Sequence, residues 1–422
     1  MYTGSNVIGE FKKFFLTDTG RDVSIVFVGT SVNIIAGGLF FVIVPRILGP
    51  ANYGLFSTVI ATGLMAAAIA NFGIDTGILK FAQSKSQLFD SIMSIALRTY
   101  LFLGFTVSGF GLFFSTFLAK FLGHPEIGNL LRIAFAGMIL LLFTNFFVAG
   151  LQAKQDFLKA SIVTLSSNIF RLILIILIFY FFQAGIYLVT ILYFIVLLIS
   201  ILVGGVFLRF NLIATDKKIT RKFLIYNFWI AFSLIISSVP FDNYFLLKLA
   251  GPIYTGIYAA PFKILTFVYQ FGGNFTRVLA SRFSSFDTDR KVINFSAKSL
   301  VPVLTFSFIL VLFIIFAQAA VNLIFGKEYL ESVNVLRILS LGFIFFFIST
   351  VPSSIILYYF GKSNVSLVIT LLKYAIFVSL LFLLIPSHKA TGAAIAFSLG
   401  ELSSLLLMTI YVISKLSFKN EH

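Results

Sequence analysis

The sequence predicts an all-α membrane protein of about twelve transmembrane helices, arranged as two pseudo-symmetric six-helix bundles around a central cavity. The first observation is composition: the 422 residues are 59% hydrophobic and only 11% charged, whereas soluble proteins are about half apolar and a quarter charged. The second is an internal repeat, and the third is a small set of charged residues inside apolar runs. Twelve spans of roughly 20 residues would use about 240 apolar positions, which leaves no material for a large soluble domain.

The N-terminal stretch 1–22 is predicted to be an amphipathic segment at the cytoplasmic surface, because Ile8, Phe11 and Phe15 fall on one helical face. The apolar run that follows is too long for a signal peptide and lacks a cleavage site. Twelve apolar runs are predicted to span the membrane: 23–45, 53–74, 95–119, 129–151, 158–182, 186–208, 223–249, 256–280, 299–325, 335–359, 365–385 and 391–413.

The distribution of basic residues orients these spans. Most of the 31 Lys and Arg residues lie at one set of span ends, which the positive-inside rule assigns to the cytoplasm. The basic residues at the outer ends are fewer: Arg46, Lys120, Arg132, Lys248, Lys327, Arg337 and Lys389. We therefore expect a multi-pass protein of the cell inner (plasma) membrane with both termini cytoplasmic. Topology and an anionic ligand then account for the net charge of +16, and no nucleic-acid partner is expected.

The expected domains follow from this topology. An N-terminal six-helix bundle covers 23–208, a basic cytoplasmic linker covers 209–222, a C-terminal six-helix bundle covers 223–414, and a cytoplasmic tail covers 415–422. Six spans are an even number, so the two bundles are predicted to share one orientation about an axis along the membrane normal.

A repeated turn motif supports this duplication. In each half Gly-Pro is followed, after three residues, by a further glycine; the two copies are Gly49, Pro50, Gly54 and Gly251, Pro252, Gly256. Weaker matches in the same order join the later spans of the two halves. Glycine reverses the chain at the end of one helix, and proline opens the next helix, where its missing N–H costs nothing. Independent convergence of short outer turns on Gly-Pro is the alternative explanation.

Charged residues deep in the spans are candidate functional groups, because a charge is costly in hydrocarbon. Four cations are predicted to line the cavity as substrate-binding groups: Arg98, Arg171, Lys263 and Lys373. A surplus of buried positive charge needs an anionic partner, and a phosphate or diphosphate would supply it. Arginine suits this role because its planar fork binds phosphate through two hydrogen bonds.

Two acids, Asp242 and Glu401, lie at similar depth. Each has two open interpretations: ion coupling, since burial favours the protonated carboxyl, or structural pairing, of Asp242 with Lys263 and of Glu401 with Lys373. No metal site or cofactor is expected, because the chain has no Cys and its three His residues are far apart. A Walker A loop is absent as well, since Ile356 stands where Gly361-Lys362-Ser363 would require a preceding glycine.

The sequence resembles the polysaccharide flippase family, of Wzx type, within the multidrug/oligosaccharidyl-lipid/polysaccharide exporter superfamily. The residues that carry the resemblance are 45–56, 71–75, Asp242, 251–252 and 256–264, followed by 351–362. The resemblance implies translocation of a polyprenyl-diphosphate-linked oligosaccharide across the membrane by alternating access coupled to a proton or sodium ion. We also expect contact with membrane lipids, association with polysaccharide polymerase machinery and a monomeric state.

Two alternatives remain open from the residues alone. One is a multidrug or small-molecule exporter of the same fold, although such exporters are expected to have acidic cavities for cationic cargo. The other is an integral membrane enzyme of envelope polysaccharide synthesis. No Ser/His/Asp or Cys/His set and no large loop with paired acids is present, so a transporter rather than an enzyme is expected.

Overall fold

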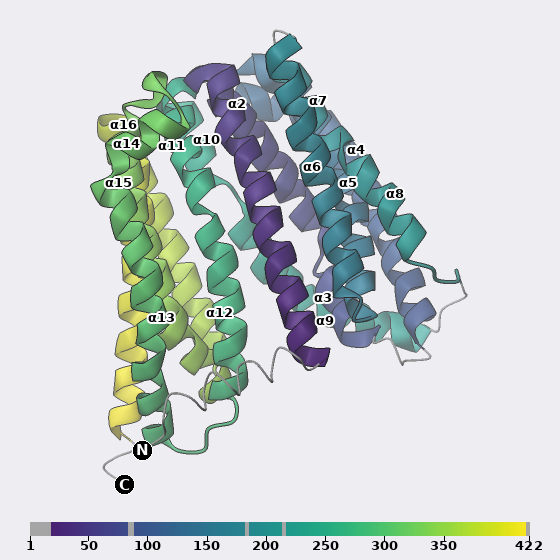
Figure 1. Ribbon diagram of the computed structural model, residues 1–422, viewed down its shortest axis with the longest axis vertical. Coiled ribbons are helices and arrows are strands. Elements are labelled where there is room, and N and C mark those ends of the chain that lie inside the picture. The colour runs from purple at the N-terminus through teal and green to yellow at the C-terminus, as the bar shows by residue number, and fades with distance from the viewer. Residues whose placement is uncertain (1–17, 83–87, 182–184, 213–216, 419–422) are drawn as a thin grey trace. The chain divides into compact units, whose positions relative to one another are not determined.

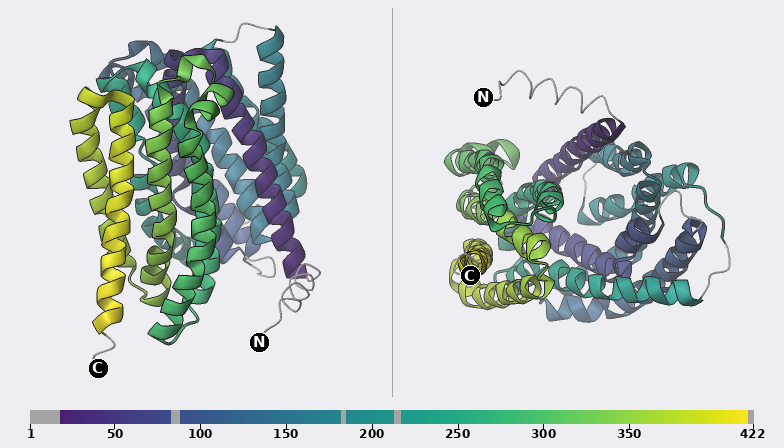
Figure 2. Two further views of the ribbon diagram at one scale, coloured as in Figure 1. Left: turned by 60° about the vertical axis from the view of Figure 1, so that its left-hand side comes forward. Right: turned by 90° about the horizontal axis from the view of Figure 1, so that it is seen from below.

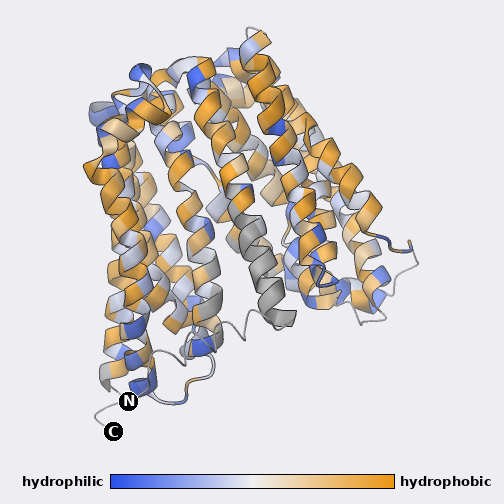
Figure 3. Ribbon diagram, in the orientation of Figure 1, coloured by the Kyte–Doolittle hydropathy of each residue, from blue (hydrophilic) through white to orange (hydrophobic). Residues whose placement is uncertain are grey.

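The computed structural model describes residues 18–82, 88–181, 185–212 and 217–418, and within these ranges the chain is helical and contains no β-strand (Figure 1). Among the residues that the structure describes, eight helices are long and apolar enough to cross a membrane, and Figure 3 shows hydrophobic residues along most of their length. This confirms the predicted all-α membrane fold. Most of the predicted amphipathic segment 1–22 and half of the predicted tail lie outside the described residues.

Contacts divide the chain into two compact units. The first unit contains residues up to Val44 and Val59–Pro240, and the second contains Pro45–Thr58 and Phe241–His422. The division made from the sequence repeat places 45–58 in the N-terminal half and 223–240 in the C-terminal half. Packing therefore places the turn at 45–58 in the second unit, although the repeat assigns it to the N-terminal half. It places the helix before Pro240 in the first unit, although the repeat assigns it to the C-terminal half.

The first unit is organised around one central helix. Most of α2 (Asp18–Asn71) belongs to it, and its other elements are α3 (Ile74–Phe81), α4 (Phe89–Phe121), η1 (Pro125–Ile127), α5 (Gly128–Ala153), α6 (Phe157–Phe181), α7 (Ile186–Ile195), α8 (Leu197–Phe207) and α9 (Lys217–Ser238). Helix α5 packs against α3, α4, α6, α7 and α8, and Figure 2 shows the helices from two further sides. It buries residues on most of its circumference, as expected of a helix largely enclosed by others.

The second unit repeats this plan. Its elements are α10 (Phe241–Leu249), α11 (Pro252–Leu265), α12 (Phe267–Phe283), α13 (Asp289–Ile315), α14 (Ala317–Ile324), η2 (Lys327–Tyr329), α15 (Ser332–Ser354), the π-helical turn η3 (Ile355–Tyr359) and α16 (Ser363–Phe418). Helix α15 packs against α11, α12, α13, α14 and α16. Helices α5 and α15 are the fourth predicted spans of their halves. Each therefore holds the central place in its unit.

Two of the long helices each contain two predicted spans. Helix α2 is kinked at Gly49, and α16 is kinked at Lys389, where the backbone leaves the helical region. Helix α16 therefore consists of a first arm, residues 363–388, and a second arm, residues 390–418. The predicted seventh span, 223–249, is wrong as a single helix: it is interrupted at Pro240, between α9 and α10. Proline lacks the N–H for the helical hydrogen bond and disfavours helix at the residue before it.

The two Gly-Pro turns have the same backbone conformation. Gly49 has φ 68° and ψ 169°, and Gly251 has φ 88° and ψ 175°. A residue with a side chain is strained at such positive φ values, whereas glycine is not. Pro252 lies at the start of α11, and Pro50 follows the kink in α2 in the same way.

A second repeated feature lies at the start of the central helices and escaped the sequence analysis. Arg132 Nη1 donates to Asn129 Oδ1 at 3.1 Å, and Arg337 Nη1 donates to Asn334 Oδ1 at 3.4 Å. Both pairs have the sequence Asn-x-Leu-Arg-Ile. The signal was present in the chain, but the arginines were interpreted only as topological charges.

The same two helices each carry a glycine that meets an aromatic ring. A Cβ at Gly137 would lie 2.3 Å from a ring atom of Phe194, and a Cβ at Gly342 would lie 2.8 Å from a ring atom of Phe397. Each glycine comes five residues after the arginine of its half. The internal repeat is therefore visible in side-chain packing as well as in the turns.

Inside the second unit the two turn motifs contact each other. The last glycine of each motif lies against the backbone of the other motif's proline. A Cβ on Gly54 would lie 2.0 Å from the Pro252 carbonyl oxygen, and a Cβ on Gly256 would lie 1.9 Å from the Pro50 carbonyl oxygen. Real Cβ contacts are never this short, so the two backbones cross in direct contact. Small residues at such crossings allow close helix packing in membranes.

This crossing predicts that Gly54→Ala and Gly256→Ala are each destabilising. A methyl group would have to displace a backbone carbonyl, and overpacking of this kind typically costs about 1–3 kcal/mol. We expect a lower thermal unfolding temperature of the purified protein in detergent. The matched control is Gly273→Ala, because nothing lies within 4 Å of a Cβ at Gly273; equal stability of all three variants would contradict the crossing.

Candidate functional site

A polar cluster lies in the first unit between α2, α6 and α7. It consists of Asn33, Thr164, Asn168, Arg171 and Tyr193, and is called the N-terminal polar cluster below. Asn33 Nδ2 donates to Thr164 Oγ1 at 2.6 Å, and Asn168 Nδ2 donates to Asn33 Oδ1 at 3.0 Å. Arg171 Nη1 donates to Asn168 Oδ1 and Nη2 to the Tyr193 carbonyl oxygen, both at 3.0 Å.

Arg171 is the charged member of this cluster, and it is 6% exposed. Its guanidinium carbon lies 4.4 Å from the ring centre of Tyr193 and 5.6 Å from that of Phe40. Its Nε is buried and has no hydrogen-bond partner. The groups that contact the guanidinium are thus an amide, a carbonyl and two aromatic rings, all of them neutral. A buried cation normally requires an anion, and none of these contacting groups is one.

The local sequence explains why the cluster forms. Thr164, Asn168 and Arg171 are three or four residues apart, so they lie on one face of α6. Helix α2 comes close to that face because it presents small residues: a Cβ on Gly29 would lie 2.7 Å from Ser161 Oγ, and one on Gly37 would lie 3.8 Å from Asn168. Asn33 lies midway between these glycines, so its amide reaches α6.

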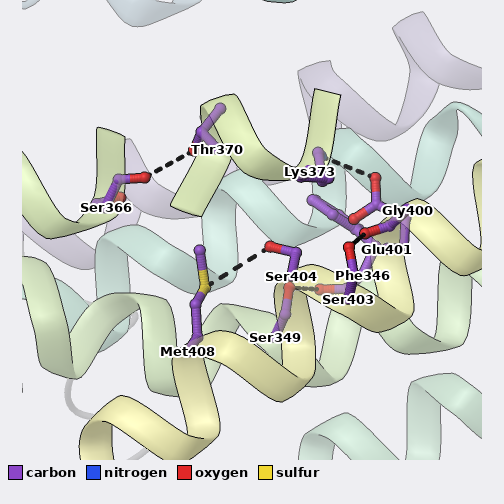
Figure 4. A network of polar contacts seen from close by, with 10 residues as sticks. All are labelled: Phe346, Ser349, Ser366, Thr370, Lys373, Gly400, Glu401, Ser403, Ser404 and Met408. Carbon is purple, nitrogen blue, oxygen red and sulfur yellow. Dashed lines mark hydrogen bonds and ion pairs between the residues drawn. The ribbon is translucent and has the colours of Figure 1, made fainter. Parts of the chain in front are cut away.

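The second unit contains a buried ion pair. Lys373 Nζ lies 3.0 Å from Glu401 Oε1, between the two arms of α16 (Figure 4). Glu401 is 3% exposed. The lysine ammonium also lies 5.3 Å from the ring centre of Tyr374. The structural pairing that the sequence offered for Glu401 is therefore present in this structure.

Asp242 lies in the first turn of α10, directly after the break at Pro240, and is 8% exposed. The Tyr258 hydroxyl donates to Asp242 Oδ2 at 2.9 Å, and the Asn243 backbone N–H donates to Oδ1 at 2.9 Å. The free N–H groups at a helix N-terminus stabilise a carboxylate there. A continuous helix would lack this stabilisation, so the break at Pro240 gives the buried acid its hydrogen bonds.

These groups belong to one region of the second unit. Tyr269 lies within electrostatic range of Glu401, Tyr374 and Asp242. Together they form the C-terminal polar cluster, whose members are Asp242, Tyr258, Tyr269, Lys373, Tyr374 and Glu401. Sequence reasoning found the charged members and missed the tyrosines, because nothing in the sequence distinguishes them from the other 13 Tyr residues among 16.

The two clusters occupy corresponding helices of the repeat. The N-terminal polar cluster uses predicted spans 1, 5 and 6, and the C-terminal polar cluster uses spans 7, 8, 11 and 12. Both place a cation on the fifth span of their half, Arg171 on α6 and Lys373 on α16. The cations differ in their partners, because Lys373 has a carboxylate and Arg171 has neutral groups.

The other two predicted cavity cations lie elsewhere in the same units. Arg98 is exposed on α4, in the first unit, and Lys263 is half-buried in the last turn of α11, in the second. The Tyr258 hydroxyl that donates to Asp242 comes from the helix that also carries Lys263. That all four cations line one cavity remains a prediction.

Metal-ion chemistry has no visible site in the part of the chain that the structure describes. No group of three or more His, Cys, Asp or Glu side chains there could hold a metal ion. The chemistry that the two clusters offer is hydrogen bonding, cation–anion pairing and proton exchange at a carboxyl group.

The fold is that of membrane transporters. The chain is similar to an inward-facing multidrug resistance MATE family transporter of the MOP superfamily, with a TM-score of 0.74 and 15% identity over 95% of this chain and 98% of that one. It is also similar to the lipid II flippase MurJ, with a TM-score of 0.67 and 16% identity over 92% of this chain and 87% of that one. These likenesses show the fold, which agrees with the all-α multi-pass membrane fold expected from sequence.

The chain belongs to the family of polysaccharide biosynthesis proteins, whose family model matches residues 19–286. It is 24% identical over 222 residues to a Shigella flexneri protein named as an O-antigen transporter, covering 50% of this chain and 53% of that protein. It is 27% identical over 192 residues to the capsular polysaccharide biosynthesis protein CapF of Staphylococcus aureus, covering 44% and 48%. The chain thus matches about half the length of these relatives.

The buried ion pair predicts strong energetic coupling between Lys373 and Glu401. Removing one partner leaves a buried charge, which typically costs about 3–5 kcal/mol, whereas Lys373→Met combined with Glu401→Leu removes both charges. We expect each single variant to be less stable than the double variant, measured by thermal unfolding in detergent.

The control for this cycle is the exposed pair Lys291–Asp287, with Nζ and Oδ1 2.7 Å apart. The hydrogen bond from Lys291 lowers the pKa of Asp287, but water and salt screen such a pair. No coupling should be measurable there. Additive effects of the two substitutions at Lys373 and Glu401 would show that the pair does not act as a unit.

Proposed function

We propose that this protein is a flippase that moves a polyprenyl-diphosphate-linked oligosaccharide across the inner membrane for surface polysaccharide assembly. The observation that carries the proposal is Arg171, a buried guanidinium with neutral partners and an unpaired Nε. Family membership and the names of the relatives support a role in polysaccharide export. The likeness to MATE and MurJ structures supports a transporter fold.

Arg171 would recognise the diphosphate of the cargo. Both Nη atoms already hold protein acceptors, Asn168 and the Tyr193 carbonyl, which fix the plane of the guanidinium. A guanidinium has five N–H donors, and these two bonds use one on each Nη, so the buried Nε donor and one donor on each Nη would be offered to an anion once the site opens. A charge-assisted hydrogen bond of this kind is about twice as strong as a neutral one, and it strengthens further where water is excluded. The neutral members of the cluster would then orient the cation rather than neutralise it.

Transport would proceed by alternating access, with the two six-helix bundles moving as largely rigid bodies. The matching plan of the two units, with α5 central in one and α15 central in the other, supports such a two-bundle transporter. On this proposal both termini are cytoplasmic, and the cargo enters from the cytoplasmic leaflet and leaves to the outer leaflet. The protein would act as a monomer and associate with the polymerase machinery that consumes its cargo.

Ion coupling is assigned to the C-terminal polar cluster. Asp242 lies at the N-terminus of a half-helix, which is a common position for ion and substrate sites in transporters. Tyr258 is bonded to Asp242, and Glu401 is bonded to Lys373. Protonation would weaken a charge-assisted interaction, between α10 and α11 for Asp242 and between the two arms of α16 for Glu401, so a proton, or a sodium ion in its place, could be linked to helix movement.

The recognition role of Arg171 predicts a loss of flipping on substitution. In proteoliposomes, we expect Arg171→Gln to reduce translocation of a lipid-linked oligosaccharide at least tenfold, and Arg171→Lys to retain part of it. The control is Arg132→Gln, since Arg132 bonds Asn129, Ser115 and Thr116 outside the cluster. If Arg171→Gln flips the lipid-linked oligosaccharide at the rate of the wild-type protein, Arg171 does not recognise the diphosphate. Export of cationic drugs by the wild type without lipid flipping would favour a small-molecule exporter.

The coupling role predicts a change in gradient dependence. We expect Asp242→Asn or Glu401→Gln to flip cargo at a rate that no longer responds to imposed proton or sodium gradients, while Glu126→Gln behaves as wild type. Glu126 suits as control because its partner, His124, is outside both clusters. The measurement is the flipping rate in vesicles with opposite gradients; an unaltered gradient response in both cluster variants would remove this role.

A further inference from the structure

A groove of about 400 Å³ lies on the second unit, between the two arms of α16 and at the end remote from the kink at Lys389. This volume falls in the range of about 300–1,000 Å³ that is usual for ligand sites. Its walls come from the start of the first arm and the end of the second: Asn364, Val365, Val368, Ile369, Leu407, Ile410, Tyr411 and Ser414.

The lining changes in polarity along the groove. Its polar members, Asn364, Tyr411 and Ser414, lie nearest the ends of the two arms, and the apolar Val368 and Leu407 lie deeper. Between Ser414 and Leu407 the second arm rises about 10 Å, at ~1.5 Å per residue. The groove therefore has a polar mouth and an apolar floor about two helical turns away.

Two exposed lysines flank the mouth. Lys362 precedes the lining residue Asn364 by two positions, and Lys415 directly follows the lining residue Ser414. Tyr411 is held at the mouth by Phe360, with ring centres 6.2 Å apart. Basic residues at the end of a transmembrane helix attract anionic lipid head groups. The mouth is thus suited to phosphate, and the floor is suited to hydrocarbon.

The surroundings of the groove decide the kind of ligand. Val368 is 54% exposed and Ile410 is 63% exposed, on helices that span a membrane. In a bilayer such a surface is covered by hydrocarbon chains. A ligand that matches both parts of the groove has a long hydrocarbon tail and a phosphate head. The groove is lined by only about two helical turns of each arm, so it would hold one segment of a long tail.

We propose that this groove binds the isoprenoid tail of the polyprenyl-diphosphate cargo next to its head group, while Lys362 and Lys415 hold the phosphates at the membrane surface. The inference rests on the proposed flippase function, which assigns this basic end of α16 to the cytoplasmic leaflet. The groove would bind the lipid part of the cargo before the head group reaches Arg171. It is separate from both polar clusters, since none of their members lines it.

The experiment uses the purified full chain in nanodiscs with a polyprenyl diphosphate that carries a photoreactive diazirine in its first isoprene units. Because the chain has no Cys, single cysteines can also report on the groove by site-specific labelling. We expect crosslinks to Val368, Leu407 and Ile410, protection of Ile410→Cys from a maleimide by the lipid, and no displacement by a tenfold excess of phosphatidylglycerol. Crosslinks that phosphatidylglycerol removes would assign the groove to ordinary phospholipid and overturn the proposal.

Two sets of variants make two distinctions. The first distinguishes binding in the groove from binding on the exposed helix surface, and the second distinguishes binding of the tail from binding of the diphosphate. Ile410→Trp should fill the groove and reduce crosslinking at least fivefold, whereas Ile413→Trp, 58% exposed and outside the lining, should leave it unchanged. Lys362→Gln and Lys415→Gln should each weaken binding of the diphosphate about fivefold, from about 1 kcal/mol per basic residue, without changing the binding of uncharged polyprenol. Equal crosslinking in the two tryptophan variants would overturn the proposal.

The outcome also distinguishes this inference from the function on which it rests. If Ile410→Trp flips cargo at the full rate and no tail crosslinks form in the groove, the proposal of tail binding is wrong and the proposed flippase function still stands. Specific tail crosslinks in a wild-type protein that flips no lipid-linked oligosaccharide in proteoliposomes would refute the flippase and leave a polyprenyl-lipid site.

Discussion

The cost of an unpaired polar group in hydrocarbon is the constraint on which this structure depends. Within each unit the buried polar side chains meet one another across helices, as Asn33 meets Thr164 and Lys373 meets Glu401. The exposed surfaces are left to apolar side chains, such as Phe102 and Phe113 on α4. In a bilayer this separation fixes which helix faces turn inward. Arg171 Nε departs from this rule, as do the side chains of Asn227, Ser307 and Ser340, but among these Arg171 is the one that carries a charge.

The sequence predicted the class of the fold because composition and hydrophobic runs determine it directly. The twelve predicted spans correspond to helices, or to pairs of helices, in the described residues. The break at Pro240 could have been read from the chain, since proline inside an apolar run is a known interruption. The assignment of 45–58 to the second unit could not, because it depends on which segments meet in space.

Prediction of the candidate site was less complete, for physical reasons. A charge inside an apolar run is conspicuous, so Arg171, Asp242, Lys373 and Glu401 were found. Whether each charge faces an opposite charge or neutral dipoles depends on tertiary contacts. Asn168 and Tyr258 were missed because a neutral polar residue costs less in a membrane than a charge and gives a weaker signal in the sequence. The pairing of Lys373 with Glu401, by contrast, was among the alternatives that the positions of the two residues suggested.

The reciprocal contact of Gly54 and Gly256 also bears on the history of the chain. The two segments meet as the halves of a self-complementary interface do, with the same residue of each copy touching the same atom of the other. A side chain added to either copy would collide with the opposite backbone, so neither copy can diverge alone at this point. This mutual constraint explains why the Gly-Pro-x3-Gly spacing stands in both halves of the chain.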